Sequence, residues 1–361
     1  MDKIVRGFVG AAVVLLSTTM VWNAHAEQKS WREAVGKQAR ETVAVPPAQP
    51  REGPGSRAYR HGQVTKELHG KGALAFWLFT PSDPVPKEAP VVLFLHGWRA
   101  VNPRDYGGWI DHLARRGSIV IYPIFEQSRR DKSEEMMADA IQATKDALEF
   151  LEAGPVRPQL DQFAIVGHSF GGGLTAQVAA RAQEAGLPVP KAIMPTQPGW
   201  KGGDRFPTDK FNQIPASVLM LVVVGDKDQF EKTRQGKVIF QTTPQIPDER
   251  KRYVMVQSDN HGRPSLVADH ASPLSPREEY GEDFTRRQLR RRRAIGRLTG
   301  MGEGTTDALD YLGYWWLCDS LMEAAFSGKT IDAVIGSPED LSMGEWSDGT
   351  PVAPLIETLT P

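Results

Sequence analysis

Short apolar runs recur along the chain, and most of them stop at a glycine, a proline or a polar residue. Runs that are apolar at nearly every position are typical of strands buried on both faces of a sheet. We therefore predict buried strands along much of the chain. They are expected at 73–79, 90–95, 118–122, 163–166, 192–194, 217–224 and 253–256.

The segments between these runs carry apolar residues at helical spacing. They predict helices over 106–116, 134–151 and 170–185, and a later helix over 306–326 whose apolar face would dock on the sheet. Strands and helices that alternate in this way form a mostly parallel sheet with helices on both faces. The predicted fold class is therefore α/β.

The first 26 residues have the pattern of a secretory signal peptide. Lys3 and Arg6 precede the apolar stretch 8–16, and Ala24-His25-Ala26 fits the small-x-small rule for cleavage. The apolar stretch is too short to span a bilayer. We expect a secreted or periplasmic protein without a stable membrane anchor.

The rest of the chain is expected to form one domain. Residues 27–60 are polar and proline-rich, which predicts a flexible lead-in that need not pack. Residues 61–361 are predicted to be a single α/β domain, with a C-terminal helical extension from about residue 278. The segment 195–215 follows a weak strand and is where a short cap would insert.

Composition adds few constraints. The 361 residues have a formal net charge of -1, so the charge balance does not point to nucleic acid. Arg290 to Arg293 lie in a basic stretch beside acidic residues and are interpreted as a solvated helix face. The one cysteine, Cys318, lies in an apolar run and is predicted to be a buried structural thiol. Metal-ligand and phosphate-loop spacings are missing from the sequence, so no metal and no cofactor are expected.

The sharpest motif is Gly167-His168-Ser169-Phe170-Gly171-Gly172, which matches G-x-S-x-G. It lies between a predicted strand and a predicted helix, where the chain must reverse within a few residues. The glycines remove the Cβ atoms that would clash in such a turn. The motif predicts a nucleophilic Ser169 and an oxyanion donor at the Phe170 N–H.

A second oxyanion donor is expected from the loop after the strand 90–95. His96-Gly97-Trp98 follows that strand directly. Acyl transfer requires two donors at the developing oxyanion. The Trp98 N–H is the candidate for the second, and His96 is expected to play a structural role.

A serine nucleophile requires a histidine base, and elimination leaves two candidates. His261 follows the last predicted strand directly, where the order Ser, Asp, His places the base. His270 lies farther on, in a stretch interpreted as a helix. We predict His261 as the base, with His270 as the weaker alternative.

The carboxylate that orients this base is expected after the strand 217–224. Gly225-Asp226-Lys227-Asp228 follows it, so two acids compete. Asp226 has the usual place of a turn-forming aspartate. We predict Asp228 as the third member of a Ser169, Asp228 and His261 triad.

These motifs together resemble the α/β-hydrolase superfamily over roughly residues 70–270. The resemblance is closest to the branch of dienelactone hydrolases, polyester hydrolases and secreted esterases, although dienelactone hydrolases use cysteine where this chain has Ser169. It implies an α/β-hydrolase fold and a serine carboxylic-ester hydrolase acting on short-acyl or accessible esters, either small or polymeric. A peptidase or acyltransferase with the same triad, or a non-catalytic binding protein, remain the alternatives.

Overall fold

The computed structural model describes residues 43–128, 130–200, 207–230, 233–281 and 304–361. The chain divides into two compact units, 1–44 and 45–361, and the described helices and strands belong to the second. The predicted signal peptide, the basic stretch Arg290–Arg293 and residues 201–206 of the predicted cap lie outside the described residues.

One nine-stranded sheet runs through the second unit, in the order β1-β2-β4-β3-β5-β6-β7-β8-β9. The six neighbours from β4 to β8 pair parallel, whereas β1, β2 and β9 pair antiparallel. The strands are β1 (Gln63–His69), β2 (Phe76–Ser82), β3 (Glu88–Leu95), β4 (Ile119–Pro123), β5 (Arg157–His168), β6 (Ala192–Thr196), β7 (Leu219–Gly225), β8 (Lys251–Val256) and β9 (Ile356–Thr358).

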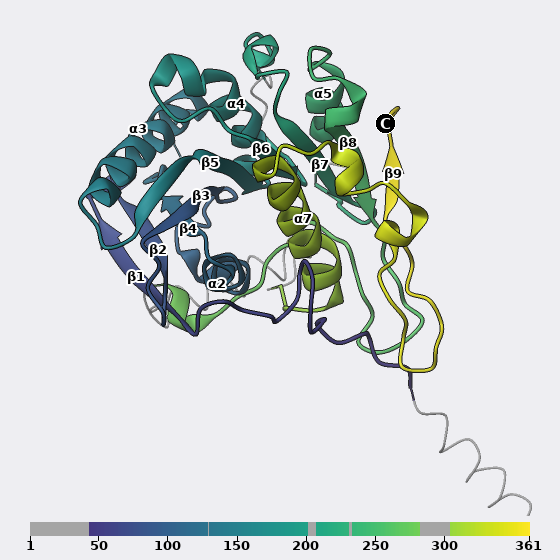
Figure 1. Cartoon of the computed structure of the whole chain (residues 1–361). Coiled ribbons are helices and arrows are strands. Elements are labelled where there is room, and N and C mark those ends of the chain that lie inside the picture. The colour runs from purple at the N-terminus through teal and green to yellow at the C-terminus, as the bar shows by residue number, and fades with distance from the viewer. Residues whose placement is uncertain (1–42, 129, 201–206, 231–232, 282–303) are drawn as a thin grey trace, which may run out of the picture. The chain divides into compact units, whose positions relative to one another are not determined.

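Helices cover both faces of this sheet, as predicted. The helices α3 (Ser133–Glu152), α4 (Phe170–Ala185) and α5 (Arg234–Gln241) pack on one face. The helices α2 (Gly107–Arg116) and α7 (Trp315–Phe326) pack on the other (Figure 1). The prediction of an α/β-hydrolase fold with a mostly parallel sheet is confirmed.

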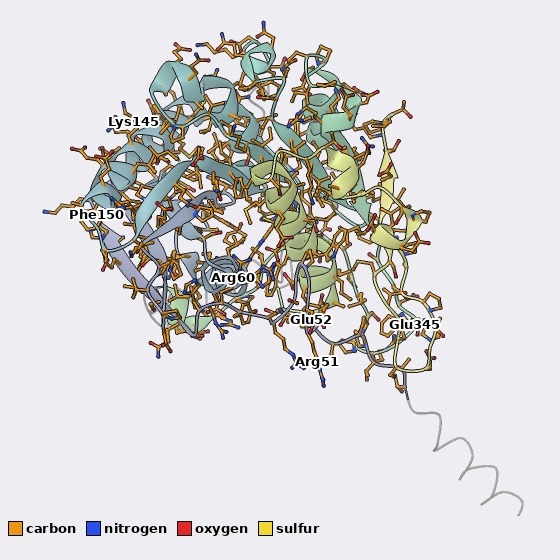
Figure 2. The ribbon with its side chains drawn as sticks, viewed as in Figure 1. Arg51, Glu52, Arg60, Lys145, Phe150 and Glu345 are labelled. Atoms are coloured by element: carbon orange, nitrogen blue, oxygen red, sulfur yellow. The ribbon has the colours of Figure 1, made fainter. Side chains whose placement is uncertain are left out.

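Burial explains why the central strands form where the apolar runs lie. Every residue of β7 is buried, and the last five residues of β3 are fully buried, because helices cover both sides. In α3 the burial is one-sided: Ala143, Ala147 and Leu148 face the core, while Lys145 and Phe150 lie on the outer side (Figure 2).

Residues 45–60 correct one prediction. They are packed, and not the loose lead-in expected from their composition. The backbone N–H of Gly55 donates to the buried carboxylate of Asp319 at 2.8 Å, and the Tyr311 hydroxyl donates to the carbonyl of Pro47 at 2.6 Å. Backbone polar groups tied to helix α7 and to the π-helical turn Asp310–Tyr314 before it hold this segment against the domain.

Other predictions concern single features of the described chain. Cys318 is free and fully buried, as predicted. No helix among the described residues has the length and apolarity that a membrane crossing requires. In that same part of the chain, no cluster of three or more histidine, cysteine or acidic side chains is arranged to hold a metal ion.

Candidate active site

Ser169 lies at a sharp turn between β5 and α4. Strand β5 ends at His168 and helix α4 begins at Phe170, so one residue makes the turn. Its backbone has φ 56° and ψ -123°, a strained conformation for a residue with a side chain. Such strain at a serine between a strand and a helix is what the G-x-S-x-G motif predicts.

The motif glycines are required because other backbone lies against them. A Cβ on Gly171 would lie 2.0 Å from the carbonyl oxygen of Leu95 at the end of β3. A Cβ on Gly167 would lie 2.3 Å from the carbonyl oxygen of Gly171. The turn can therefore be this tight, and lie this close to β3, only with glycine at both positions.

His270 joins Ser169 to Asp228. Its Nε2 lies 2.8 Å from the Ser169 Oγ, and its Nδ1 lies 2.9 Å from the Asp228 Oδ2. The side chains of His270 and Asp228 are only 8% and 2% exposed. A carboxylate beside Nδ1 favours the tautomer with the proton on Nδ1, which leaves Nε2 to accept the serine proton.

The prediction of His261 as the base is wrong. Its Nε2 lies 2.8 Å from the Asp348 Oδ2, and its side chain is 39% exposed. The reason is a chain excursion after β8: Asp259 and Leu266 form an antiparallel bridge, so the residues between them turn away. The chain then returns, and His270, outside any named helix, meets the serine.

The sequence did contain a hint in favour of His270. It lies in the mostly apolar stretch Leu266-Val267-Ala268-Asp269-His270-Ala271, whereas His261 is preceded by Ser258-Asp259-Asn260 and followed by Gly262. A base in a triad is held in a mostly buried setting, so small apolar neighbours favour His270.

The two acids after β7 have different hydrogen-bond partners. Asp228 is buried and accepts from His270 and, at 3.0 Å through Oδ1, from the Phe230 N–H. Asp226 instead accepts from the backbone N–H and the hydroxyl of Ser258. The structure therefore places Asp228 beside the histidine and Asp226 in the turn.

The loop after β3 lies directly beside the serine. A Cβ on Gly97 would lie 3.3 Å from the Cβ of Ser169. The loop is held by its own backbone: the Gly97 N–H donates to the Tyr106 hydroxyl at 3.0 Å, and the Arg99 N–H donates to Glu126 Oε2 at 2.7 Å. Trp98, the expected oxyanion donor, lies between these two anchored amides, and its side chain is 45% exposed.

The other expected donor is the N–H of Phe170. Phe170 is the first residue of α4, and the N–H groups of a first helical turn have no partner within the helix. The same helix end carries a partial positive charge that favours a developing anion. Phe170 and Trp98 thus lie on the two segments that adjoin Ser169.

His96 is a buried structural residue. Its ring stacks on Phe125 with centroids 4.0 Å apart, and its Nδ1 lies 2.8 Å from the Gly97 carbonyl oxygen. Burial lowers the pKa of His96 to about 4. It is therefore neutral at the pH where a serine hydrolase works, as its predicted structural role requires.

Buried polar side chains that the sequence analysis missed hold the segment carrying His270. The Gln197 Nε2 lies 2.9 Å from the carbonyl oxygen of Asp269 and 2.9 Å from the Tyr314 hydroxyl. The Ser272 hydroxyl lies 2.7 Å from that same carbonyl oxygen. Gln197 follows β6 and has φ 41°, an unusual value that marks a constrained position.

The sheet order, the strained serine and its contact with His270 define a protein of the α/β-hydrolase fold. The model of the family described as Chlorophyllase matches residues 63–198. That family is an α/β-hydrolase-type family of serine esterases, so the match supports a hydrolase that acts on esters. The matched region includes Ser169 and the loop after β3 but ends before Asp228 and His270. No curated protein matches the chain.

Proposed function

We propose that the chain is a serine carboxylic-ester hydrolase that works through an acyl-enzyme on Ser169. The single observation that carries this proposal is the buried His270 imidazole, which lies within hydrogen-bond distance of both Ser169 and Asp228. This geometry corresponds to a nucleophile, a general base and the group that orients the base.

The reaction would run in two steps. In the first, His270 takes the Ser169 proton as the serine oxygen attacks the ester carbonyl carbon, and it then returns the proton to the departing alcohol. In the second, His270 takes a proton from water, the hydroxide attacks the acyl-enzyme, and the acid leaves as Ser169 regains its proton. Asp228 stabilises the imidazolium that forms in each step.

The amide N–H groups of Trp98 and Phe170 would hold the oxyanion. Two donors at this place lower the barrier because the negative charge develops only in the transition state. Both residues adjoin Ser169, one through Gly97 and the other along the chain.

The surroundings support an ester whose reactive carbonyl is accessible. The Phe230 ring lies 5.2 Å from the His270 ring and is 44% exposed, and Trp98 is also partly exposed. The half-exposed aromatic ring of Phe230 beside His270 would bind apolar parts of a substrate. We propose short-acyl or otherwise accessible esters as the substrate class.

A fluorophosphonate probe tests the chemistry. We expect it to label the wild type and to leave the Ser169→Ala variant unlabelled. Circular dichroism should show that the two proteins are equally folded. A panel of p-nitrophenyl esters of graded acyl length beside aminoacyl anilides tests the substrate class. Anilide cleavage with no ester cleavage would indicate a peptidase, and an unlabelled wild type would overturn the serine mechanism.

Export remains a separate proposal from the sequence. The motif Ala24-His25-Ala26 supports cleavage after residue 26. Expression with a C-terminal tag, followed by N-terminal sequencing of the exported product, tests it. A mature chain that begins at Glu27 supports the proposal, and a product that retains residues 1–26 contradicts it.

A further inference from the structure

A line of buried hydrogen bonds runs from the loop after β3 to the backbone of His270. The Gly97 N–H lies 3.0 Å from the Tyr106 hydroxyl, and that hydroxyl lies 2.8 Å from the His168 Nδ1. The His168 Nε2 lies 2.9 Å from the His270 carbonyl oxygen. His168, next to the nucleophile in the sequence, is only 3% exposed, and Tyr106 is fully buried.

The direction of every hydrogen bond in this line is fixed by chemistry. A backbone N–H can only donate, so Gly97 donates to the Tyr106 oxygen. A carbonyl oxygen can only accept, so the proton of His168 must be on Nε2. Burial, with the neighbouring His270 as a smaller cause, lowers the pKa of His168 to about 3, so the ring is neutral. Its Nδ1 is then unprotonated and accepts from the Tyr106 hydroxyl.

We infer that Tyr106 and His168 are positioning residues that couple the loop after β3, named the oxyanion loop for its proposed role, to the His270 base. One end of the line orients the Gly97 amide, which directly precedes the Trp98 amide. The other end holds the backbone of His270 beside Ser169. This inference rests on the proposed function, and it adds two residues that touch neither the serine oxygen nor the substrate carbonyl.

The coupling has a physical reason in the way the site is built. His270 lies on a segment outside the named helices and strands, so no strand or helix ladder fixes its backbone. The oxyanion loop is equally irregular and contains Arg99 at φ 71°. Displacing a catalytic group by about 1 Å can cost about 100-fold in rate. These shared buried hydrogen bonds would hold both irregular segments in fixed positions relative to the turn at Ser169.

The test uses Tyr106→Phe and His168→Leu, each of which removes the two hydrogen bonds that its side chain makes in this line without adding charge. We expect kcat for p-nitrophenyl acetate to fall by about tenfold to 100-fold in each variant, with KM nearly unchanged. The double variant is expected to lose little more than either single variant, because both act through one line. His168→Gln keeps an amide donor near the Nε2 position, and it should recover most of the kcat lost in His168→Leu.

Tyr311→Phe is the matched control. Its hydroxyl also donates a hydrogen bond, in this case to the backbone carbonyl of Pro47, and lies outside this line. We expect it to lower the melting temperature about as much as Tyr106→Phe while kcat stays at the wild-type value. This comparison separates a loss of stability from a loss of positioning.

Two outcomes would overturn the inference while leaving the proposed function intact. The first is an active wild type whose kcat is unchanged in Tyr106→Phe and His168→Leu. The second is a pair of fully additive losses, which would mean that the two residues act independently. A wild type that is not labelled at Ser169 would instead contradict the proposed function itself.

Discussion

The Nε2 of His270 lies 2.8 Å from the Oγ of Ser169, across 101 positions of sequence. This contact brings the turn after β5 together with an irregular segment that follows β8. The bridge between Asp259 and Leu266 lies between that strand and this segment. The contact places beside the serine a histidine that the order of strands alone does not select. The consequences of this contact can be measured residue by residue.

The first prediction concerns the two acids after β7. Asp228→Asn should lower kcat by about 10⁴-fold, because an amide no longer stabilises the imidazolium or fixes its tautomer. Asp226→Asn should cost less than about tenfold, because Asp226 binds Ser258 and not His270. Steady-state kinetics on p-nitrophenyl acetate would compare them, and an equal loss in both variants would contradict this division of roles.

The second prediction concerns the packing of the turn at Ser169, between β5 and α4, against β3. Gly171→Ala should reduce the free energy of unfolding by about 3 kcal/mol or more, because the new Cβ would overlap the Leu95 carbonyl oxygen. Gly313→Ala is the control: it is also buried, but its nearest neighbour is the flexible Met343 side chain at 3.6 Å. We expect a change below about 1 kcal/mol there. Urea unfolding measures both, and similar losses would show that the close approach is not limiting.

The third prediction concerns pH and stability. The pKa of His168 is lowered from 6.5 to about 3 in the folded state, so below pH 6.5 the unfolded chain binds the proton first. The free energy of unfolding of the wild type should therefore fall relative to His168→Gln as the pH decreases. The expected slope is about 1.4 kcal/mol per pH unit.

Urea titrations from about pH 7 to about pH 5 would measure that difference. The comparison with His168→Gln is needed because other buried groups titrate in the same range. Burial raises the pKa of Asp307 to about 6, and a raised carboxyl pKa stabilises the fold as the pH falls. A difference that stays constant with pH would contradict a neutral, buried His168.

The central strands of the sheet and the turn at Ser169 could be predicted from the sequence, because the strands there are buried on both faces and this burial shows in their local pattern. The apolar runs 90–95, 163–166 and 217–224, which lie in or overlap β3, β5 and β7, have few polar residues, so their pattern predicts strands directly. The edge strands β1 and β9 were missed because all of their residues are exposed or half-buried and show no such run.

The contact of His270 with Ser169 was missed for a different reason. The excursion that carries His261 away depends on contacts from the far end of the chain. The Asp259 Oδ2 accepts from the Trp346 Nε1 at 3.0 Å and from the Ala353 N–H at 2.9 Å. These partners are 87 and 94 positions away, so local pattern could not show that the chain turns outward before it returns to Ser169.

The most direct measurement compares His270→Ala with His261→Ala. Both variants are assayed for p-nitrophenyl acetate hydrolysis and for fluorophosphonate labelling of Ser169, with folding checked by circular dichroism. We expect His270→Ala to lower kcat/KM by about 10⁴-fold or more. We expect His261→Ala to stay within about twofold of the wild type. An inactive His261→Ala together with an active His270→Ala would contradict the proposed role of His270 as the base.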